Sequence, residues 1–491
     1  MTTRPSRLLL LGIDSMNLGF VREHLDRLPT LRRLLAASAP RTLQSPADVA
    51  SASVWPTFAS GELPGHHGEY FPFQWDAATM SFRRTDRGPW ADQFAYDPFW
   101  FRLARRGVPC VVFDAAHIGR SRDVPCVQIV NWSYQSSGAA FSDPPELLSE
   151  LRRRFGRRPI GPEVPVPKKR RRTRALRDQL LRAVEAKGDA ILWMAERQPW
   201  RFYLAAMYEV HRAGHNLWPV DAEFASEAEP DAMLEVYAAT DRQLGRILER
   251  FDDGETAGVV FALSGMEANR AQNHFLPEVL ARLSAAWRER GGGEAPPRPR
   301  ASLVAALRRL APFELQYHAA RLLGERIQDW VVDRTLRGGL DWRTTPAFAL
   351  SGGGEGYIRL NVRGRERDGC LDAVKVPEFA AWLEGELREI RVVPGGAPLV
   401  AEIVRLGERY PGPKASRLPD LAVRWAPAAP ATRIASPTLG EIEARLETGR
   451  GGNHTADAFA IFWGPDPGAG IDSEVARVED LSRYCERFFA P

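Results

Sequence analysis

The sequence predicts an α/β protein with a mostly parallel central sheet and a helical insertion. Short apolar, β-branched segments alternate with longer amphipathic segments along most of the chain, which is typical of strands joined by helices. One stretch, residues 278–339, departs from this alternation and has the pattern of consecutive helices. Polar clusters also follow several of the predicted strands, and ligands bind at the carboxyl ends of parallel strands.

The strands are predicted from the short apolar segments, at residues 8–13, 110–113, 127–130, 202–208, 259–263, 357–362 and 459–463. The longer amphipathic segments predict helices at residues 16–37, 146–155, 174–196, 231–251 and 377–389. We expect a single domain over residues 1–491, with residues 278–339 as a helical insertion or cap within it.

The composition is that of an ordinary soluble protein. Of 491 residues, 44% are hydrophobic and 26% are charged, and the net charge of +4 is too small to indicate a nucleic-acid polymer or a membrane as partner. No run of about 18 apolar residues is present. The four cysteines are scattered, without metal-ligand spacing. We therefore expect a cytoplasmic protein.

One pair of histidines has a spacing that suits metal binding. Among the nine histidines, only His211 and His215 stand four residues apart, directly after the predicted strand 202–208. Two imidazoles on adjacent helical turns can bind one metal ion. Surface pairs with this spacing also arise by chance, so the pair alone leaves both interpretations open.

Two further segments have a chemical and a structural interpretation. Ser51 precedes Pro56, which suits the first turn of a helix, and a hydroxyl there would face N–H groups that stabilise an anion. Ser51, Ser53 and Thr57 fit equally well as helix-capping residues. Residues 450–454 contain two glycines before His454, so the backbone can approach a ligand closely there, or simply turn.

The order of these segments carries a family resemblance. It rests on Gly12-Ile13-Asp14-Ser15, residues 28–34, 51–68, 209–215, 357–361, 364–366 and 419–421, and Gly452-Asn453-His454. This series resembles the type I phosphodiesterase/nucleotide pyrophosphatase branch of the alkaline phosphatase superfamily. The resemblance implies an alkaline-phosphatase-like α/β/α sandwich and metal-dependent phosphoryl transfer on a small-molecule phosphate or sulfate ester.

The resemblance also implies catalytic and metal-binding roles. Ser51 matches the position of the family's nucleophile, and Asp14 matches a metal-binding aspartate at the end of the first strand. His215 and His454 match ligands of one metal site. His211 stands where the family usually has aspartate, so this chain would offer three imidazoles, a known arrangement for Zn²⁺.

The second metal site departs from the family pattern. Leu263 and Ser264 stand where the family has an aspartate and a histidine, and leucine cannot bind a metal. We therefore expect one Zn²⁺, with Mn²⁺ as an alternative, and an incomplete second site. By the same resemblance, Arg365, Asn361 and Glu209 are candidate substrate-binding residues.

Three functions remain open from the sequence. The first is a hydrolase of phosphodiester or pyrophosphate bonds that forms a covalent intermediate on Ser51. The second is a transferase that passes the same group to an alcohol or amine, and the third is a binding protein that has lost catalysis. Trp55 stands where a formylglycine sulfatase needs arginine, which argues against that chemistry. The sequence also has no P-loop motif.

Overall fold

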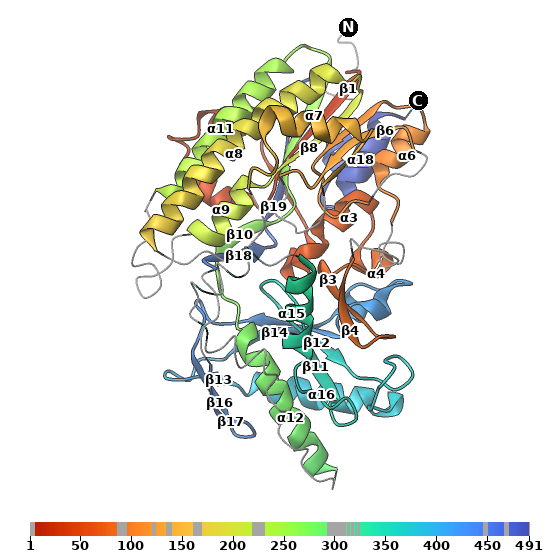
Figure 1. Ribbon diagram of the computed structural model, residues 1–491, viewed down its shortest axis with the longest axis vertical. Coiled ribbons are helices and arrows are strands. Elements are labelled where there is room, and N and C mark those ends of the chain that lie inside the picture. The colour runs from red at the N-terminus through yellow and green to blue at the C-terminus, as the bar shows by residue number, and fades with distance from the viewer. Residues whose placement is uncertain are drawn as a thin grey trace. The chain divides into compact units, whose positions relative to one another are not determined.

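Two main groups of strands organise the chain, and each lies in a separate unit of the computed structural model (Figure 1). Unit 1 comprises Met1–Leu63, Asp86–Glu267 and Gly449–Pro491, and unit 2 comprises Pro64–Thr85 and Ala268–Thr448. The structure describes residues 5–85, 96–119, 124–133, 140–160, 169–218, 231–291, 311, 315, 319, 322, 325–444, 450–465 and 471–490.

Unit 1 is built around an eight-stranded sheet with the order β2-β19-β9-β1-β8-β5-β6-β7. Its strands are β1 (Arg7–Ile13), β2 (Arg41–Leu43), β5 (Cys110–Phe113), β6 (Cys126–Val130), β7 (Phe141–Asp143), β8 (Phe202–Met207), β9 (Thr256–Ala262) and β19 (Ala458–Trp463). The pairs from β9 through β1, β8 and β5 to β6 are parallel, whereas β19 and β7 are antiparallel to their neighbours. The predicted α/β class with a mostly parallel sheet is confirmed.

The central strands are apolar because helices cover both faces of the sheet. All residues of β8 and β9 are buried, and β1 is buried from Leu8 onward, as expected for a parallel sheet between two helical layers. Figure 1 shows α8 (Arg170–Arg197) and α11 (Ala232–Arg250) on one side of this sheet and α6 (Phe99–Arg105) and α18 (Asp480–Phe488) on the other. Unit 1 also contains α3 (Val54–Ser60) and α7 (Glu146–Phe155).

The first predicted helix is interrupted. Residues 16–37 form α1 (Leu18–Glu23) and α2 (Pro29–Ala37) instead of one helix. The Asn17 side chain caps α1 by accepting a hydrogen bond from the Phe20 backbone N–H at 2.7 Å. Because Leu28 precedes a proline, it is disfavoured from the helical conformation, and Pro29 then begins a new helix.

The register between β1 and β8 brings the residues that follow each strand to the same edge of the sheet. In the parallel pair of β1 and β8, Ile13 lies opposite Met207, and the backbone N–H of Asp14 donates to the Met207 carbonyl at 2.9 Å. Helix α9 (Glu209–Leu217) begins directly after β8. Asp14 and the first turn of α9 therefore lie together at the carboxyl edge of the sheet.

Unit 2 contains a four-stranded antiparallel sheet with the order β11-β12-β15-β14. Its strands are β11 (Ala347–Leu350), β12 (Gly356–Leu360), β14 (Val400–Arg405) and β15 (Leu421–Trp425). The predicted strand 357–362 corresponds to β12 and so belongs to this sheet. Apolar residues of α12 (Leu276–Arg290) and α16 (Val376–Arg388) share one core with the sheet.

The remaining described helices and strands of unit 2 are short, apart from α15. They are α4 (Pro64–His67), β3 (Phe73–Asp76), β4 (Ser81–Arg84), α15 (Glu325–Arg337), β13 (Arg391–Val392), α17 (Leu406–Arg409), β16 (Arg433–Ser436) and β17 (Gly440–Glu443). Within the predicted helical stretch 278–339, α12 and α15 are helices, whereas residues 292–310 lie outside the described part. No helix in the described part of the chain combines the length and apolar character needed to cross a membrane.

Candidate active site

Helix α9 presents two imidazoles on one face. His211 and His215 are separated by one helical turn, so their side chains point the same way. Both are buried, with 7% and 1% of their surface exposed. The sequence places them here because the apolar strand β8 ends at Met207 and α9 starts two residues later.

A short strand brings the third imidazole. Strand β18 (Gly452–Thr455) pairs with β10 (Gly265–Ala268) and carries His454. The Gly451 backbone N–H donates to the His215 carbonyl at 2.7 Å, which joins β18 to α9. A Cβ atom on Gly452 would lie 2.5 Å from the Gly214 carbonyl oxygen, so this close approach requires glycine.

The three imidazoles converge. Their ring centroids are 4.6 Å apart for His211 and His215, 4.7 Å for His211 and His454, and 4.9 Å for His215 and His454. One ligand atom from each lies within 4.8 Å of the others. Among the described residues this is the only group of three or more histidine, cysteine, aspartate or glutamate side chains arranged to bind a metal ion.

The hydrogen bonds of His211 and His215 indicate which ring nitrogens can bind a cation. His215 Nδ1 donates to the Gly452 carbonyl at 2.8 Å, so its Nε2 carries a lone pair when the ring is neutral. Burial, followed by the charge of Arg450, lowers the pKa of His215 well below its usual value and favours the neutral ring. His211 Nδ1 faces the Asp14 carboxylate, and its Nε2 lies 2.8 Å from the Nε2 of His215. With both rings in the neutral form, a divalent cation can accept the two Nε2 lone pairs.

Asp14 is held from two sides. Its Oδ1 accepts a hydrogen bond from the Trp55 indole N–H at 2.9 Å, and its Oδ2 contacts His211 Nδ1. Burial by itself would raise the pKa of Asp14, but the charges of His211 and His454 and the hydrogen bonds from His211 and Trp55 lower it below its usual value. Asp14 is therefore an ionised acceptor beside the imidazole cluster.

The candidate nucleophile lies next to the helix that contacts Asp14. Ser51 begins a short 3-10 turn, Ser51–Ser53, which leads into α3, and its surface is 4% exposed. The Trp55 indole in the first turn of α3 makes the hydrogen bond to Asp14. Helix α3 ends at Gly61, whose left-handed conformation (φ 77°) closes the last turn with a hydrogen bond to the Thr57 carbonyl.

Two hydroxyls contact His454. Ser15 Oγ lies 3.1 Å and Ser264 Oγ 3.4 Å from His454 Nδ1, and the two hydroxyls are 3.2 Å apart. Ser15 has a positive φ of 57°, a conformation that costs energy for residues other than glycine. Leu263, which directly precedes Ser264 in the sequence, is also buried. The sequence did not indicate a role for Ser15, although Ser15 directly follows Asp14. It also did not indicate the contact of Trp55 with Asp14, because no local pattern marks it.

Glu209 is fully buried at the start of α9. Its Oε2 accepts a hydrogen bond from the Tyr208 backbone N–H at 3.0 Å, and its Oε1 has no hydrogen-bond partner among the described residues. Burial raises the pKa of Glu209, although the charge of Lys187 opposes this. The predicted role of Glu209 in substrate binding stays a prediction.

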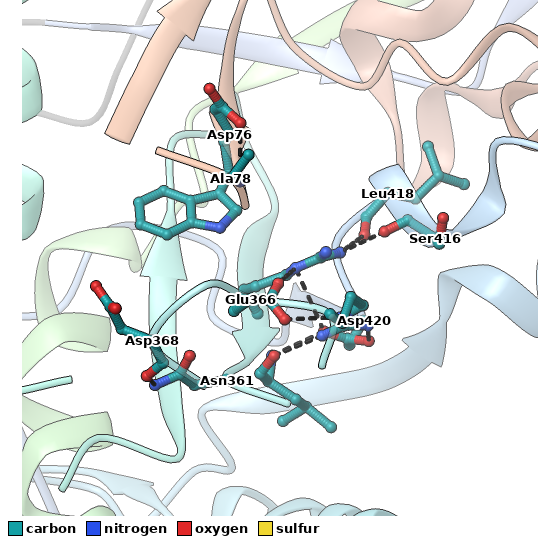
Figure 2. A network of polar contacts seen from close by, with 12 residues as sticks. Asp76, Ala78, Asn361, Glu366, Asp368, Ser416, Leu418 and Asp420 are labelled. Carbon is teal, nitrogen blue, oxygen red and sulfur yellow. Dashed lines mark hydrogen bonds and ion pairs between the residues drawn. The ribbon is translucent and has the colours of Figure 1, made fainter. Parts of the chain in front are cut away.

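Figure 2 shows Asn361, Glu366 and Asp420 in a polar network of unit 2. Arg365 belongs to the same network through its contacts with Glu366 and Asp420. Arg365 binds both carboxylate oxygens of Asp420, at 2.6 and 2.7 Å, and its Nε donates to Glu366 at 2.9 Å. The Asn361 amide donates to the carbonyls of Trp342 and Thr345 at 2.9 and 3.0 Å. These contacts give both side chains a structural role, and their predicted contact with substrate stays a prediction.

The same network also holds the Arg359 side chain in place. Arg359 is 3% exposed, and its Nε donates to Glu366 at 2.6 Å while its Nη1 donates to the carbonyls of Ser416 and Leu418. Asp420 in turn accepts the backbone N–H of Leu360 at 2.7 Å. The network therefore fixes the end of β12 against the segment that enters β15.

Comparisons with known proteins agree with this fold. A sequence profile described as type I phosphodiesterase/nucleotide pyrophosphatase matches residues 8–337. Phosphonoacetate hydrolase from Sinorhizobium meliloti 1021, in complex with phosphonoacetate, has a similar structure, with a TM-score of 0.52, 15% sequence identity, and coverage of 100% of this chain and 97% of that chain. Murine ectonucleotide pyrophosphatase/phosphodiesterase 5 gives a TM-score of 0.50, 11% identity, and coverage of 99% and 95%. A comparison with curated sequences gave no match.

Proposed function

The chain belongs to the type I phosphodiesterase/nucleotide pyrophosphatase family and is a phosphohydrolase, and on this basis we propose that it hydrolyses phosphodiester or pyrophosphate bonds of a small molecule, with a divalent metal ion and a covalent intermediate on Ser51. The observation that carries the proposal is the convergence of His211, His215 and His454 next to Asp14. Of these residues, His211, His215 and Asp14 are buried, whereas His454 is half-buried and so leaves the cluster partly accessible.

The donor set favours zinc over manganese. Three neutral imidazole nitrogens suit Zn²⁺, whereas Mn²⁺ prefers carboxylate and other oxygen ligands. When bound by His211, His215 and His454, such an ion supplies positive charge that stabilises the phosphoryl oxygens. The hydrogen bonds from His211 to Asp14 and from His215 to Gly452 fix the two rings on α9 before any ligand arrives.

Ser51 carries the group transfer in this proposal. Its Oγ attacks phosphorus, the Oγ–P bond forms, the P–O bond to the leaving alcohol breaks, and the serine proton ends on that alcohol. Water then attacks phosphorus, the Oγ–P bond breaks, and the phosphate monoester and free Ser51 are released. Burial of Ser51 limits competing contact with solvent.

The proposal is tested with Ser51→Ala and a neighbouring control. We expect Ser51→Ala to lower hydrolysis of bis(p-nitrophenyl) phosphate by roughly 10⁴-fold, because the nucleophile is lost, and to leave the bound metal unchanged. The control Ser53→Ala removes a buried hydroxyl from the same 3-10 turn and should keep most of the activity. Full activity in Ser51→Ala would refute the proposed nucleophile.

A separate experiment tests whether water or another molecule accepts the phosphoryl group from Ser51. In ¹⁸O-labelled water, hydrolysis should place the label in the released phosphate monoester. If no label enters and activity depends on an added alcohol or amine, the enzyme is a transferase that uses the same site. If neither product forms with any divalent metal, the proposal of catalysis through Ser51 is wrong.

A further inference from the structure

Each of the three clustered histidines has a hydrogen-bond partner at Nδ1. His211 Nδ1 contacts the Asp14 carboxylate, His215 Nδ1 donates to the Gly452 carbonyl at 2.8 Å, and His454 Nδ1 lies 3.1 Å from the Ser15 hydroxyl. With Nδ1 engaged in each ring, Nε2 is the nitrogen that can bind a metal ion. Metal-binding histidines commonly have their other nitrogen fixed in this way, which sets both the tautomer and the orientation of the ring.

The contacts of Asp14 fit a supporting role better than that of a metal ligand. One carboxylate oxygen accepts the Trp55 indole N–H at 2.9 Å, and the other contacts His211 Nδ1. Each oxygen therefore already has a donor within the protein. A carboxylate that accepts from the outer nitrogen of a metal-binding histidine raises the basicity of that ring and holds it in place.

The groups that contact His454 Nδ1 are neutral hydroxyls. Ser15 Oγ and Ser264 Oγ are 3.2 Å apart, and both lie within 3.4 Å of His454 Nδ1. Leu263, the neighbour of Ser264, is 1% exposed and apolar. Two hydroxyls and a leucine supply no negative charge, and a second divalent ion beside the first needs anionic ligands to offset the repulsion between the two charges.

We propose that this centre binds a single divalent metal ion through the Nε2 atoms of His211, His215 and His454, and that Asp14 is a positioning residue for His211 and does not bind a second ion. The inference rests on the proposed function, because it concerns the same centre. Ser15 and Ser264 hold the His454 ring in the same way that Asp14 holds His211.

The first experiment counts metal ions in the wild-type protein. Protein loaded with excess Zn²⁺ and dialysed without chelator is analysed by inductively coupled plasma mass spectrometry. One ion per chain supports the inference. Two ions per chain would overturn it and leave the proposed function standing, whereas no bound ion would overturn both the inference and the metal dependence of the proposed function.

The second experiment separates positioning from direct binding. We expect Asp14→Asn to keep one bound ion and to weaken Zn²⁺ affinity by about 10- to 100-fold. The control Asp457→Asn alters an exposed carboxylate three residues after His454, whose partner is Thr455 at 2.8 Å, and it should leave the affinity unchanged. Unchanged affinity in Asp14→Asn, or loss of one of two ions, would contradict the positioning role.

A third measurement needs no variant and so does not depend on the folding of Asp14→Asn. Wild-type protein is titrated with Co²⁺, and its visible and electron paramagnetic resonance spectra are followed. A single site predicts spectra that stop changing at one equivalent and show an isolated high-spin ion. Further changes up to two equivalents, with signs of spin coupling between the ions, would overturn the inference.

Discussion

At the scale of single residues, His211 contacts both Asp14 and His215. Because an imidazole has two nitrogens, His211 contacts Asp14 through Nδ1 and turns Nε2 toward His215, 2.8 Å away. The sequence shows the spacing of His211 and His215 directly. It cannot show the contact with Asp14, because that residue lies 197 positions earlier and meets His211 only when β1 and β8 pair.

His67, a histidine outside the cluster, predicts how the stability of the protein depends on pH. Burial, together with the charges of Lys414 and His66, lowers the pKa of His67 to about 3. Its Nδ1 accepts the Glu69 backbone N–H at 3.0 Å, which also favours the neutral ring. Between pH 6.5 and about 3 the unfolded chain therefore binds a proton that the folded protein excludes.

We therefore predict that the contribution of His67 to stability is complete above about pH 6.5 and is lost progressively as the pH falls toward 3. The loss should approach about 1.4 kcal/mol of unfolding free energy per pH unit. Denaturant unfolding of wild type and His67→Gln at several pH values measures it. The difference between the two proteins at pH 8 gives the packing cost of the substitution, and a difference that does not change down to pH 5 would contradict the prediction.

At the scale of elements, the metal cluster depends on how β18 packs against α9. The sequence predicts β8 and the histidine pair after it, because an apolar run and an i, i+4 spacing are local patterns. The position of β18 is not a local pattern. It is set by the hydrogen bond from the Gly451 N–H to the His215 carbonyl and by the close approach of Gly452 to Gly214.

Gly452→Ala tests this packing. The added methyl group would lie 2.5 Å from the Gly214 carbonyl oxygen and 3.1 Å from that of Glu267, so β18 must move away from α9 and take His454 with it. We predict weaker Zn²⁺ binding, by about tenfold or more, in isothermal titration calorimetry, and a lower melting temperature. Zn²⁺ affinity equal to that of the wild type would show that the cluster tolerates this shift.

The matched control is Gly385→Ala in α16. A Cβ atom there meets no heavy atom within 4 Å, and alanine favours a helix over glycine by about 0.5–1 kcal/mol. This variant should therefore keep the metal affinity and raise the melting temperature slightly.

At the scale of the whole molecule, unit 1 is assembled from three separate parts of the chain. The last part, Gly449–Pro491, supplies His454 and also β19, which lies between β9 and β2 in the sheet. The sequence predicts β19 as an apolar run but not its antiparallel direction. It also predicts the strand at residues 357–362 without indicating that β12 belongs to the separate sheet of unit 2.

We predict that a chain ending at Thr448 cannot form unit 1, because removal of β19 exposes the buried edge of β9. It should show no stoichiometric Zn²⁺ binding and rapid proteolysis within unit 1. The control His454→Ala removes one imidazole but keeps β19, so it should remain folded and resist proteolysis while its Zn²⁺ affinity falls. A truncated chain that binds Zn²⁺ as tightly as the wild type would disprove this.

From the sequence alone follow the α/β class, the family resemblance and the candidates His211, His215, His454 and Asp14, but not Ser15 or Trp55. These follow from local patterns, since the alternation of apolar residues and the order of short motifs need no knowledge of distant contacts. The orientation of the imidazoles, in contrast, depends on contacts between distant parts of the chain. The bonds that orient the imidazoles join residues 197, 237 and 439 positions apart, and such pairs are set by strand order, register and side-chain direction, which only the packed sheet defines.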